Sequence, residues 1–224
     1  MATSARPETM NFAFPEYTRG ERVVDLSIHA VAIIGSLVGV SILLAISIDK
    51  LPGLSIAGVA IYCAGLLAVF CCSAAYNFVR RQNLKAIFRR LDQAAIYIKI
   101  AATYTPFAAL KMASLPGTGL LTVVWVIAIF GMTVKLWFPE RLIKTSYALY
   151  LALGWAALVV AQPLAASVSG LTLLMLCLGG MLYTIGVIFH FWISLPYHNA
   201  IWHAFVLAGS SCHYVAVLDS VAFS

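Results

Sequence analysis

Seven apolar stretches, each about as long as a helix that crosses a bilayer, occupy most of this 224-residue chain. A transmembrane helix needs about 20 predominantly apolar residues. Backbone groups in lipid must be satisfied within the segment, and these stretches lack the alternation of barrel strands. The sequence therefore predicts an all-α bundle of seven transmembrane helices. The stretches cover residues 23–46, 54–79, 94–110, 120–138, 147–166, 171–195 and 200–217.

The composition supports a membrane protein. Hydrophobic residues make up 62% of the chain and charged residues 10%, whereas soluble domains carry about 25% charged residues. The first 22 residues are polar, and the first apolar stretch is too long for the core of a cleavable signal peptide. We expect a cytoplasmic N-terminal tail over residues 1–22 and a single seven-helix membrane domain over residues 23–222.

Basic side chains predict the orientation of the bundle. They gather before the first stretch and in the second and fourth connections, whereas the other connections carry little beyond Lys50 and Lys111. Cytoplasmic loops carry an excess of Lys and Arg, so we expect a cytoplasmic N-terminus and an outside C-terminus. The basic residues in question are Arg6, Arg19, Arg22, Arg80, Arg81, Lys85, Arg89, Arg90, Arg141 and Lys144.

The same pattern predicts the location and the partners. We expect a multi-pass protein of the cell membrane. The basic loops are short and lie at the lipid headgroups, which favours anionic lipid over nucleic acid as a partner. The outer loops are too short to suggest a protein ligand.

Polar residues within the apolar stretches gather at the ends assigned to the cytoplasmic face. Residues four apart share a helical face, and polar groups are costly in lipid, so they normally face the bundle interior. This pattern predicts a shared polar pocket near the inner leaflet. Alternatively, each residue snorkels to water, or Asp25 and Asp92 cap helix N-termini. The residues are Glu21, Asp25, His29, Ser73, Asn77, Asp92, Gln93, His190, Asn199 and His203.

A lysine deep in the third stretch indicates a specific role, because a charged side chain within the membrane is costly. Lys99 lies seven residues beyond Asp92, which is roughly 10 Å along a helix axis. Its charge takes the place of a metal ion in the polar pocket, or its side chain snorkels to the interface. Both interpretations remain open.

Several strings resemble the hemolysin III proteins, bacterial relatives of the progestin and adipoQ receptor family. The resemblance covers nearly the whole chain and implies seven helices with a cytoplasmic N-terminus in the bacterial inner membrane. It is carried by GERVVDLSIH (20–29), CSAAYN (72–77), RRLDQAAIYIKIAATYTPF (89–107) and HNAIWHAFVLAGSSCHY (198–214), among others.

The wider superfamily, which includes alkaline ceramidases, has a zinc site built from Ser-x-x-x-His, an Asp and His-x-x-x-His. The resemblance places Ser73, Asp92 and His203 at three of these positions and puts Asn77 and Asn199 at two histidine positions. Asparagine oxygen is a poor partner for zinc. The resemblance thus implies zinc, whereas the asparagines argue that the metal is lost or is replaced by a harder ion with oxygen ligands.

An alternative metal site would use His29, Asp92 and His203, a combination that the family pattern does not include. We assign Asp92 and Ser73 as the candidate catalytic residues. We assign His203, Asn77 and Asn199 to the candidate metal positions. The pocket residues are Asp25, His29, Gln93 and Lys99.

Three functions are compatible with these features. The first is a role in membrane lipid homeostasis, with a degenerate or altered zinc site. The second is a metal-dependent lipid amide or ester hydrolase, with Asp92 as general base and Ser73 bonded to the developing oxyanion. The third is the pore-forming cytolysin that the family name implies, although no stretch carries a continuous polar stripe that would line a conducting path.

Overall fold

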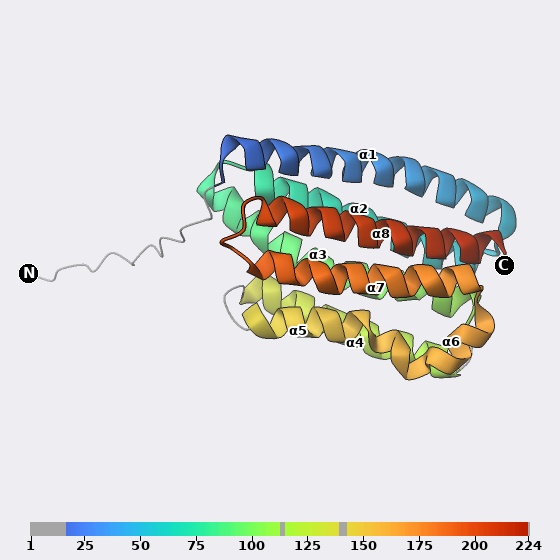
Figure 1. The fold of residues 1–224 in the computed structure, drawn as a ribbon. Coiled ribbons are helices and arrows are strands. Elements are labelled where there is room, and N and C mark those ends of the chain that lie inside the picture. The colour runs from blue at the N-terminus through green and yellow to red at the C-terminus, as the bar shows by residue number, and fades with distance from the viewer. Residues whose placement is uncertain (1–16, 113–114, 139–142, 224) are drawn as a thin grey trace, which may run out of the picture.

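The structure is a computed structural model that describes residues 17–112, 115–138 and 143–223, and all regular elements within these ranges are helices. This confirms the all-α prediction. The helices lie side by side, with the start of α1 and the end of α8 at opposite ends of the bundle (Figure 1). The elements are α1 (Arg19–Lys50), α2 (Gly53–Phe78), α3 (Gln82–Leu110), α4 (Leu115–Trp137), α5 (Ile143–Gly154), the 3-10 helix η1 (Ala156–Val160), α6 (Ala161–Ser167), α7 (Gly170–Phe191) and α8 (His198–Ala222).

Six helical segments in the described part of the chain are long and apolar enough to cross a membrane. They are α1, α2, α4, α7, α8 and the combined segment Thr145–Ser167. Helix α3 is not in this set because its first half is rich in charged and polar residues. Length and composition therefore establish a multi-pass protein with six apolar helices, one fewer than the sequence predicts.

The third helix begins twelve residues earlier than predicted, at Gln82 instead of residue 94. The added segment, QNLKAIFRRLDQ, is rich in good helix formers and too polar to register as an apolar stretch. Asp92 therefore lies about three turns inside α3 and does not cap it. Asp25 is not a cap either, because Thr18 and Glu21 form the capping box of α1.

The fifth predicted stretch is broken into α5, η1 and α6. Pro163 contributes to the break, because proline lacks a backbone N–H and its ring clashes with the carbonyl four residues earlier. Tyr104 of α3 bonds to backbone groups at the end of α5 and the start of η1. Its hydroxyl lies 2.8 Å from the Leu153 carbonyl oxygen and accepts a hydrogen bond from the Ala157 N–H at 3.1 Å.

Helix α7 ends at Phe191, four residues before the predicted end at Leu195. The following segment contains Pro196, and the residue before a proline disfavours the helical conformation. The connection to α8 passes through Tyr197, whose φ of 62° is left-handed. The backbone N–H of Tyr197 donates to Glu21 Oε1 at 2.9 Å, which ties this connection to the start of α1.

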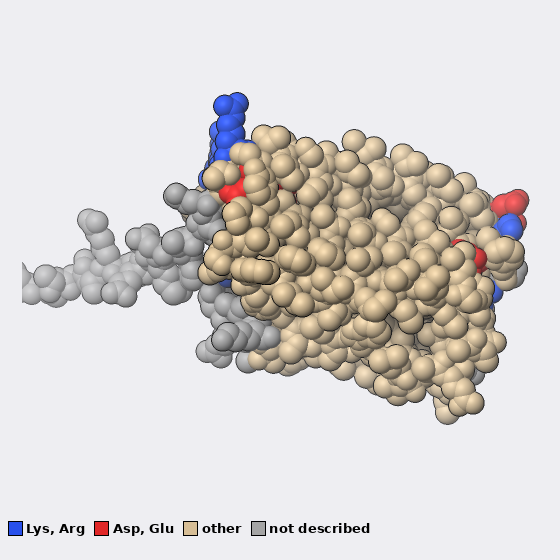
Figure 2. Space-filling view, viewed as in Figure 1, with Lys and Arg blue, Asp and Glu red and all other residues tan. Residues whose placement is uncertain are grey.

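Charged side chains lie at the two ends of the bundle, and the side between them is uncharged (Figure 2). The start of α1 and the connection between α2 and α3 lie at the same end (Figure 1). At the other end, Lys50 and Lys111 donate to the carbonyl oxygens of Ala222 and Phe223, each at 2.9 Å. These lysines stabilise the C-terminus of α8. Of the basic residues considered above, Arg6, Arg141 and the side chain of Lys144 lie outside the described residues.

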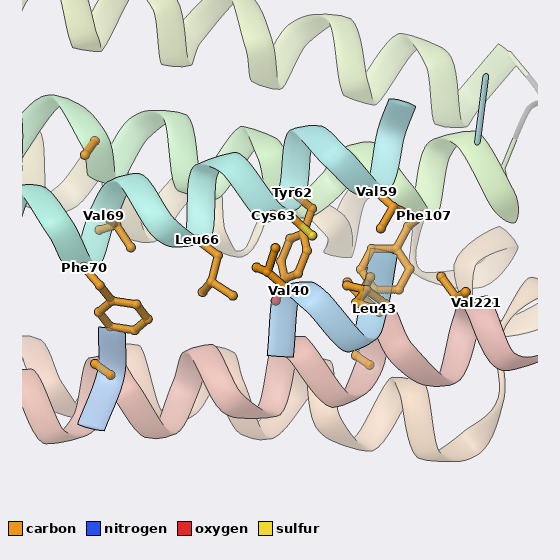
Figure 3. Close-up of a cluster of buried hydrophobic side chains, with 14 of the residues drawn as sticks. Val40, Leu43, Val59, Tyr62, Cys63, Leu66, Val69, Phe70, Phe107 and Val221 are labelled. Atoms are coloured by element: carbon orange, nitrogen blue, oxygen red, sulfur yellow. The ribbon is translucent and has the colours of Figure 1, made fainter. Parts of the chain in front are cut away.

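The largest apolar core lies between α1, α2, α3 and α8, and Figure 3 shows its central side chains, including Leu43, Tyr62 and Phe107. Small residues let the helices approach closely. A Cβ added to Gly65 of α2 would lie 2.8 Å from the Cβ of Ala102 in α3. Close backbone contact through small residues is typical of membrane helix pairs.

Candidate functional site

A polar cluster lies where α1, α2 and α8 meet, near the end of the bundle that holds the start of α1. Helical spacing explains how the chain builds it, because each helix contributes two residues that are four apart and share a face. Asp25, His29 and Ser73 are buried, with exposed fractions of 7%, 3% and 8%. We call this set the inner cluster; it contains Asp25, His29, Ser73, Asn77, Asn199 and His203.

Asp25 orients both histidines of the inner cluster through their Nδ1 atoms. His203 Nδ1 lies 2.5 Å from Asp25 Oδ1, and His29 Nδ1 lies 2.8 Å from the Asp25 carbonyl oxygen. Both Nε2 atoms face the Ser73 hydroxyl, at 3.3 Å from His29 and 3.5 Å from His203. One hydroxyl has a single proton to donate, so at least one Nε2 lone pair remains available to a ligand.

The two asparagines belong to the same hydrogen-bond network. Asn199 Nδ2 lies 3.4 Å from Asp25 Oδ2 and 3.3 Å from Asn77 Oδ1. Asn77 Nδ2 donates to the Ser73 carbonyl oxygen at 2.9 Å. The amide of Asn199 therefore holds Asp25, and the amides of Asn77 and Asn199 hold each other.

Three residues of the inner cluster have the geometry of a metal site. One ligand atom each from Asp25, His29 and His203 lies within 4.8 Å of the others. Two imidazoles and a carboxylate form a donor set used by catalytic zinc sites, so the residues present fit zinc, and other transition metals take such donors too. His29 and Asp25, both from α1, supply donors that Asn77 and Asn199 lack.

A cavity of about 140 Å³ begins at the inner cluster and continues along the bundle between α3, α5, α7 and α8. His29, Ser73 and His203 line one end of it, together with Asp92. The candidate catalytic residues Asp92 and Ser73 therefore face the same space, and most of the remaining wall is apolar or aromatic.

Lys99 and Gln93 are not part of the inner cluster. The Lys99 side chain is 6% exposed and donates to the Tyr183 hydroxyl at 2.6 Å, further along the same cavity. Lys99 is thus buried and does not snorkel to the interface; it lines the same cavity as His29 and His203, and its ammonium is bonded to Tyr183. Gln93 does not line the cavity. Its backbone carbonyl oxygen accepts a hydrogen bond from the Tyr150 hydroxyl at 2.9 Å.

The aromatic residues of the cavity were not predicted. Tyr147, Tyr150, Tyr183 and Trp155 line it, and the Tyr147 hydroxyl lies 2.7 Å from His190 Nε2. Tyrosines inside apolar stretches could have predicted a polar interior, since a buried tyrosine usually has a hydrogen-bond partner. Tyr183 and Tyr147 both follow this rule.

The inner cluster is also open toward the end of the bundle. A vestibule of about 1200 Å³ reaches Asp25, Asn77 and Asn199 and is lined by Arg19 and Arg22 among other basic residues. The inner cluster therefore separates a basic vestibule from an apolar cavity. This arrangement suits an amphipathic molecule with an anionic or polar head.

The fold and the site together define a multi-pass helical membrane protein with an intramembrane Asp–His–His cluster. The family model described as "Haemolysin-III related" matches residues 19–214. The chain therefore belongs to the hemolysin III family, as the sequence resemblance indicates.

Similar proteins support this assignment over most of the chain. The Hemolysin-3 homolog of Bacillus subtilis is 33% identical over 202 residues, which cover 90% of this chain and 95% of that protein. Hemolysin-3 of Bacillus cereus is 32% identical over 198 residues, 88% of this chain and 90% of that protein. The human monocyte to macrophage differentiation factor is 27% identical over 203 residues, 88% of this chain and 83% of that protein.

No solved structure matches the chain significantly. The bacterial relatives and the six apolar helices support a multi-pass protein of the bacterial cell membrane. The human relative supports the link to the progestin and adipoQ receptor family.

Proposed function

We propose that α3 is a seventh span and that the N-terminus is cytoplasmic. Helix α3 has 29 residues, or about 43 Å, against a hydrocarbon core of about 30 Å. It packs against both α2 and α4. An odd number of spans also agrees with the opposite positions of the α1 start and the α8 end (Figure 1). On this basis residues 1–22 are a cytoplasmic tail and residues 23–222 one membrane domain.

Single-cysteine labelling tests this topology. All five native cysteines are first replaced, and cysteines are then placed at Gln82 and at Ser224. A membrane-impermeant maleimide should label Ser224→Cys in intact cells and Gln82→Cys only after lysis. Labelling of both positions in intact cells would refute the proposed orientation.

We propose that the protein binds membrane lipid and acts in lipid homeostasis. The proposal rests on the order of three environments along the bundle: the basic vestibule, the inner cluster and the apolar cavity. A lipid has the same order of groups, because its polar headgroup adjoins its acyl chains. Anionic lipid is the expected partner, since Arg19 and Arg22 line the vestibule.

A deletion strain tests this role. Loss of the protein should change acyl-chain order and slow growth in the cold or with saturated lipid. A purely lipid-binding role requires that Asp92→Asn and His203→Ala variants still restore growth. An unchanged membrane in the deletion strain would contradict the proposal.

A second candidate is a lipid amide or ester hydrolase, favoured by the position of Ser73 and Asp92 beside the three potential metal ligands. A bound metal ion would supply Lewis acidity at this point. Asp92 would take a proton from water as the water oxygen adds to the lipid carbonyl carbon. Ser73 would donate a hydrogen bond to the developing oxyanion, and Asp92 would return the proton to the leaving nitrogen or oxygen as its bond to carbon breaks.

Turnover of a defined lipid amide by the purified protein separates the two candidates. Asp92→Asn should reduce hydrolysis by at least about 10²-fold, because a general acid–base group typically contributes 10²- to 10⁴-fold. His203→Ala should also reduce hydrolysis, because it removes a potential metal ligand. Asp49→Asn is the matched control, since Asp49 is exposed at the end of α1 far from the inner cluster. Hydrolysis that survives both substitutions would exclude this mechanism.

A further inference from the structure

A second polar group lies deeper in the bundle, around Lys99. The Lys99 ammonium donates to the Tyr183 hydroxyl at 2.6 Å and lies 4.6 Å from the centre of its ring. The Tyr183 and Ser210 hydroxyl oxygens are 2.6 Å apart. Three helices, α3, α7 and α8, thus bring one cation and two hydroxyl groups together.

The Lys99 charge has no carboxylate partner in the part of the chain that the structure describes. No acidic side chain among the described residues pairs with Lys99, and the Asp25 carboxylate pairs with His29 and His203. Asp92 is seven residues away on the same helix, about 10 Å along the axis. A buried ammonium at membrane depth is costly unless it is paired. A negative group from outside the chain would therefore stabilise the Lys99 ammonium.

The space beside Lys99 is suited to a molecule larger than an inorganic ion. A second cavity, of about 160 Å³, adjoins the first; both are lined by Trp155 and His213. The second cavity continues toward the far end of the bundle past Phe107, Met112 and Leu120. The walls on both sides of Lys99 are thus mainly apolar, while His213 Nδ1 is buried without a partner among the described residues.

We propose that Lys99 and Tyr183 form a deep anion site that binds the carboxylate of an amphipathic acid whose apolar chain lies in the adjoining cavities. The Lys99 ammonium and the Tyr183 hydroxyl donate to the carboxylate oxygens, and Ser210 then donates to the Tyr183 oxygen. The site is separate from the inner cluster and does not depend on a metal or on hydrolysis.

Binding of radiolabelled dodecanoate to the full-length protein in uncharged detergent tests the proposal. Dodecanol serves as the neutral analogue, and acetate and chloride serve as anions without a chain. Dodecanoate should bind at least tenfold more tightly than dodecanol. Lys99→Met should weaken dodecanoate binding roughly ten- to a hundredfold, as expected for a charge-assisted hydrogen bond, and should leave dodecanol binding unchanged.

Lys135→Met is the matched control, because Lys135 is also a buried lysine, 1% exposed, and lines neither cavity. It should leave dodecanoate binding unchanged. Tyr183→Phe provides a second variant if Lys99→Met does not fold; it should weaken dodecanoate binding severalfold. His203→Ala should retain binding, which separates this site from the inner cluster.

Two results would overturn the proposal. Equal binding of dodecanoate and dodecanol to the unmodified protein would show that Lys99 is neutral or does not contact the ligand. Acetate or chloride that displaces dodecanoate at concentrations similar to that of dodecanoate itself would show a small-anion site, and the amphipathic ligand would be wrong.

Discussion

Removal of the His203 imidazole gives the sharpest test of the inner cluster as a metal site. His203 is one of three potential ligands within 4.8 Å of one another, and its Nδ1 is held by Asp25 at 2.5 Å. We therefore expect the purified protein to bind about one zinc ion per chain and His203→Ala to bind much more weakly.

The size of the loss follows from typical zinc energetics. Structural four-ligand sites bind zinc with about 10 to 16 kcal/mol, which is roughly 2.5 to 4 kcal/mol per ligand. Loss of one ligand thus weakens binding roughly 10²- to 10³-fold, since 1.4 kcal/mol corresponds to a factor of ten. Asp25→Asn would remove the carboxylate of the site but leave the backbone carbonyl that holds His29 Nδ1, and the loss should be of similar size.

Elemental analysis and competition with a zinc chelator measure this effect, on protein prepared without a histidine tag. His198→Ala is a matched control, because it removes a histidine of α8 that lies five residues from His203 and on another face. Equal zinc affinity in His203→Ala and the unmodified protein would refute the metal site. A folded, metal-free unmodified protein that takes up no added zinc would do the same.

Three further predictions address packing, the broken segment and membrane permeability. Gly65→Ala should destabilise the bundle by about 1 to 3 kcal/mol, because its new Cβ would lie 2.8 Å from the Cβ of Ala102. Gly35→Ala is the control and should not destabilise the bundle, because nothing lies within 4 Å of its new Cβ. Equal shifts of the two variants in thermal unfolding would contradict this reasoning. Tyr104→Phe should lower the free energy of unfolding by about 1 to 3 kcal/mol in the same assay, since the Ala157 N–H loses its acceptor. An unchanged unfolding midpoint would contradict a stabilising role of the Tyr104 hydroxyl at the broken segment. Liposomes that contain the pure protein should retain a trapped dye, and rapid leakage would favour a pore.

The sequence predicts most helices because their signals are local. Long apolar stretches identify membrane helices without knowledge of their neighbours. The grouping of Asp25, His29 and His203 at one end follows from alternating helix direction, and the structure brings these residues together. The early start of α3 is not predicted by hydropathy, because its first turns are polar. The helix-forming residues of that segment could have predicted it.

The remaining features depend on contacts between distant residues. The break after α5 is stabilised by Tyr104, about fifty residues earlier in the chain. The position of the Lys99 side chain depends on Tyr183, which lies 84 residues further on. The sequence places Lys99 at the right depth, yet it does not show whether its side chain points to the inner cluster or away from it.

The two asparagines occupy positions where the resemblance to the wider superfamily implies histidine ligands. In this chain Asn77 and Asn199 bond to each other, and Asn199 also bonds to Asp25, while His29 of α1 comes close to His203, with ring centres 4.4 Å apart. The donors available to a metal thus shift from α2 toward α1, and Asn199 orients one of these donors. A search for metal ligands restricted to the family positions would leave only Asp92 and His203, whereas the folded chain offers Asp25 and His29 beside them. For this chain, therefore, loss of the family histidines is not sufficient grounds to infer loss of metal binding.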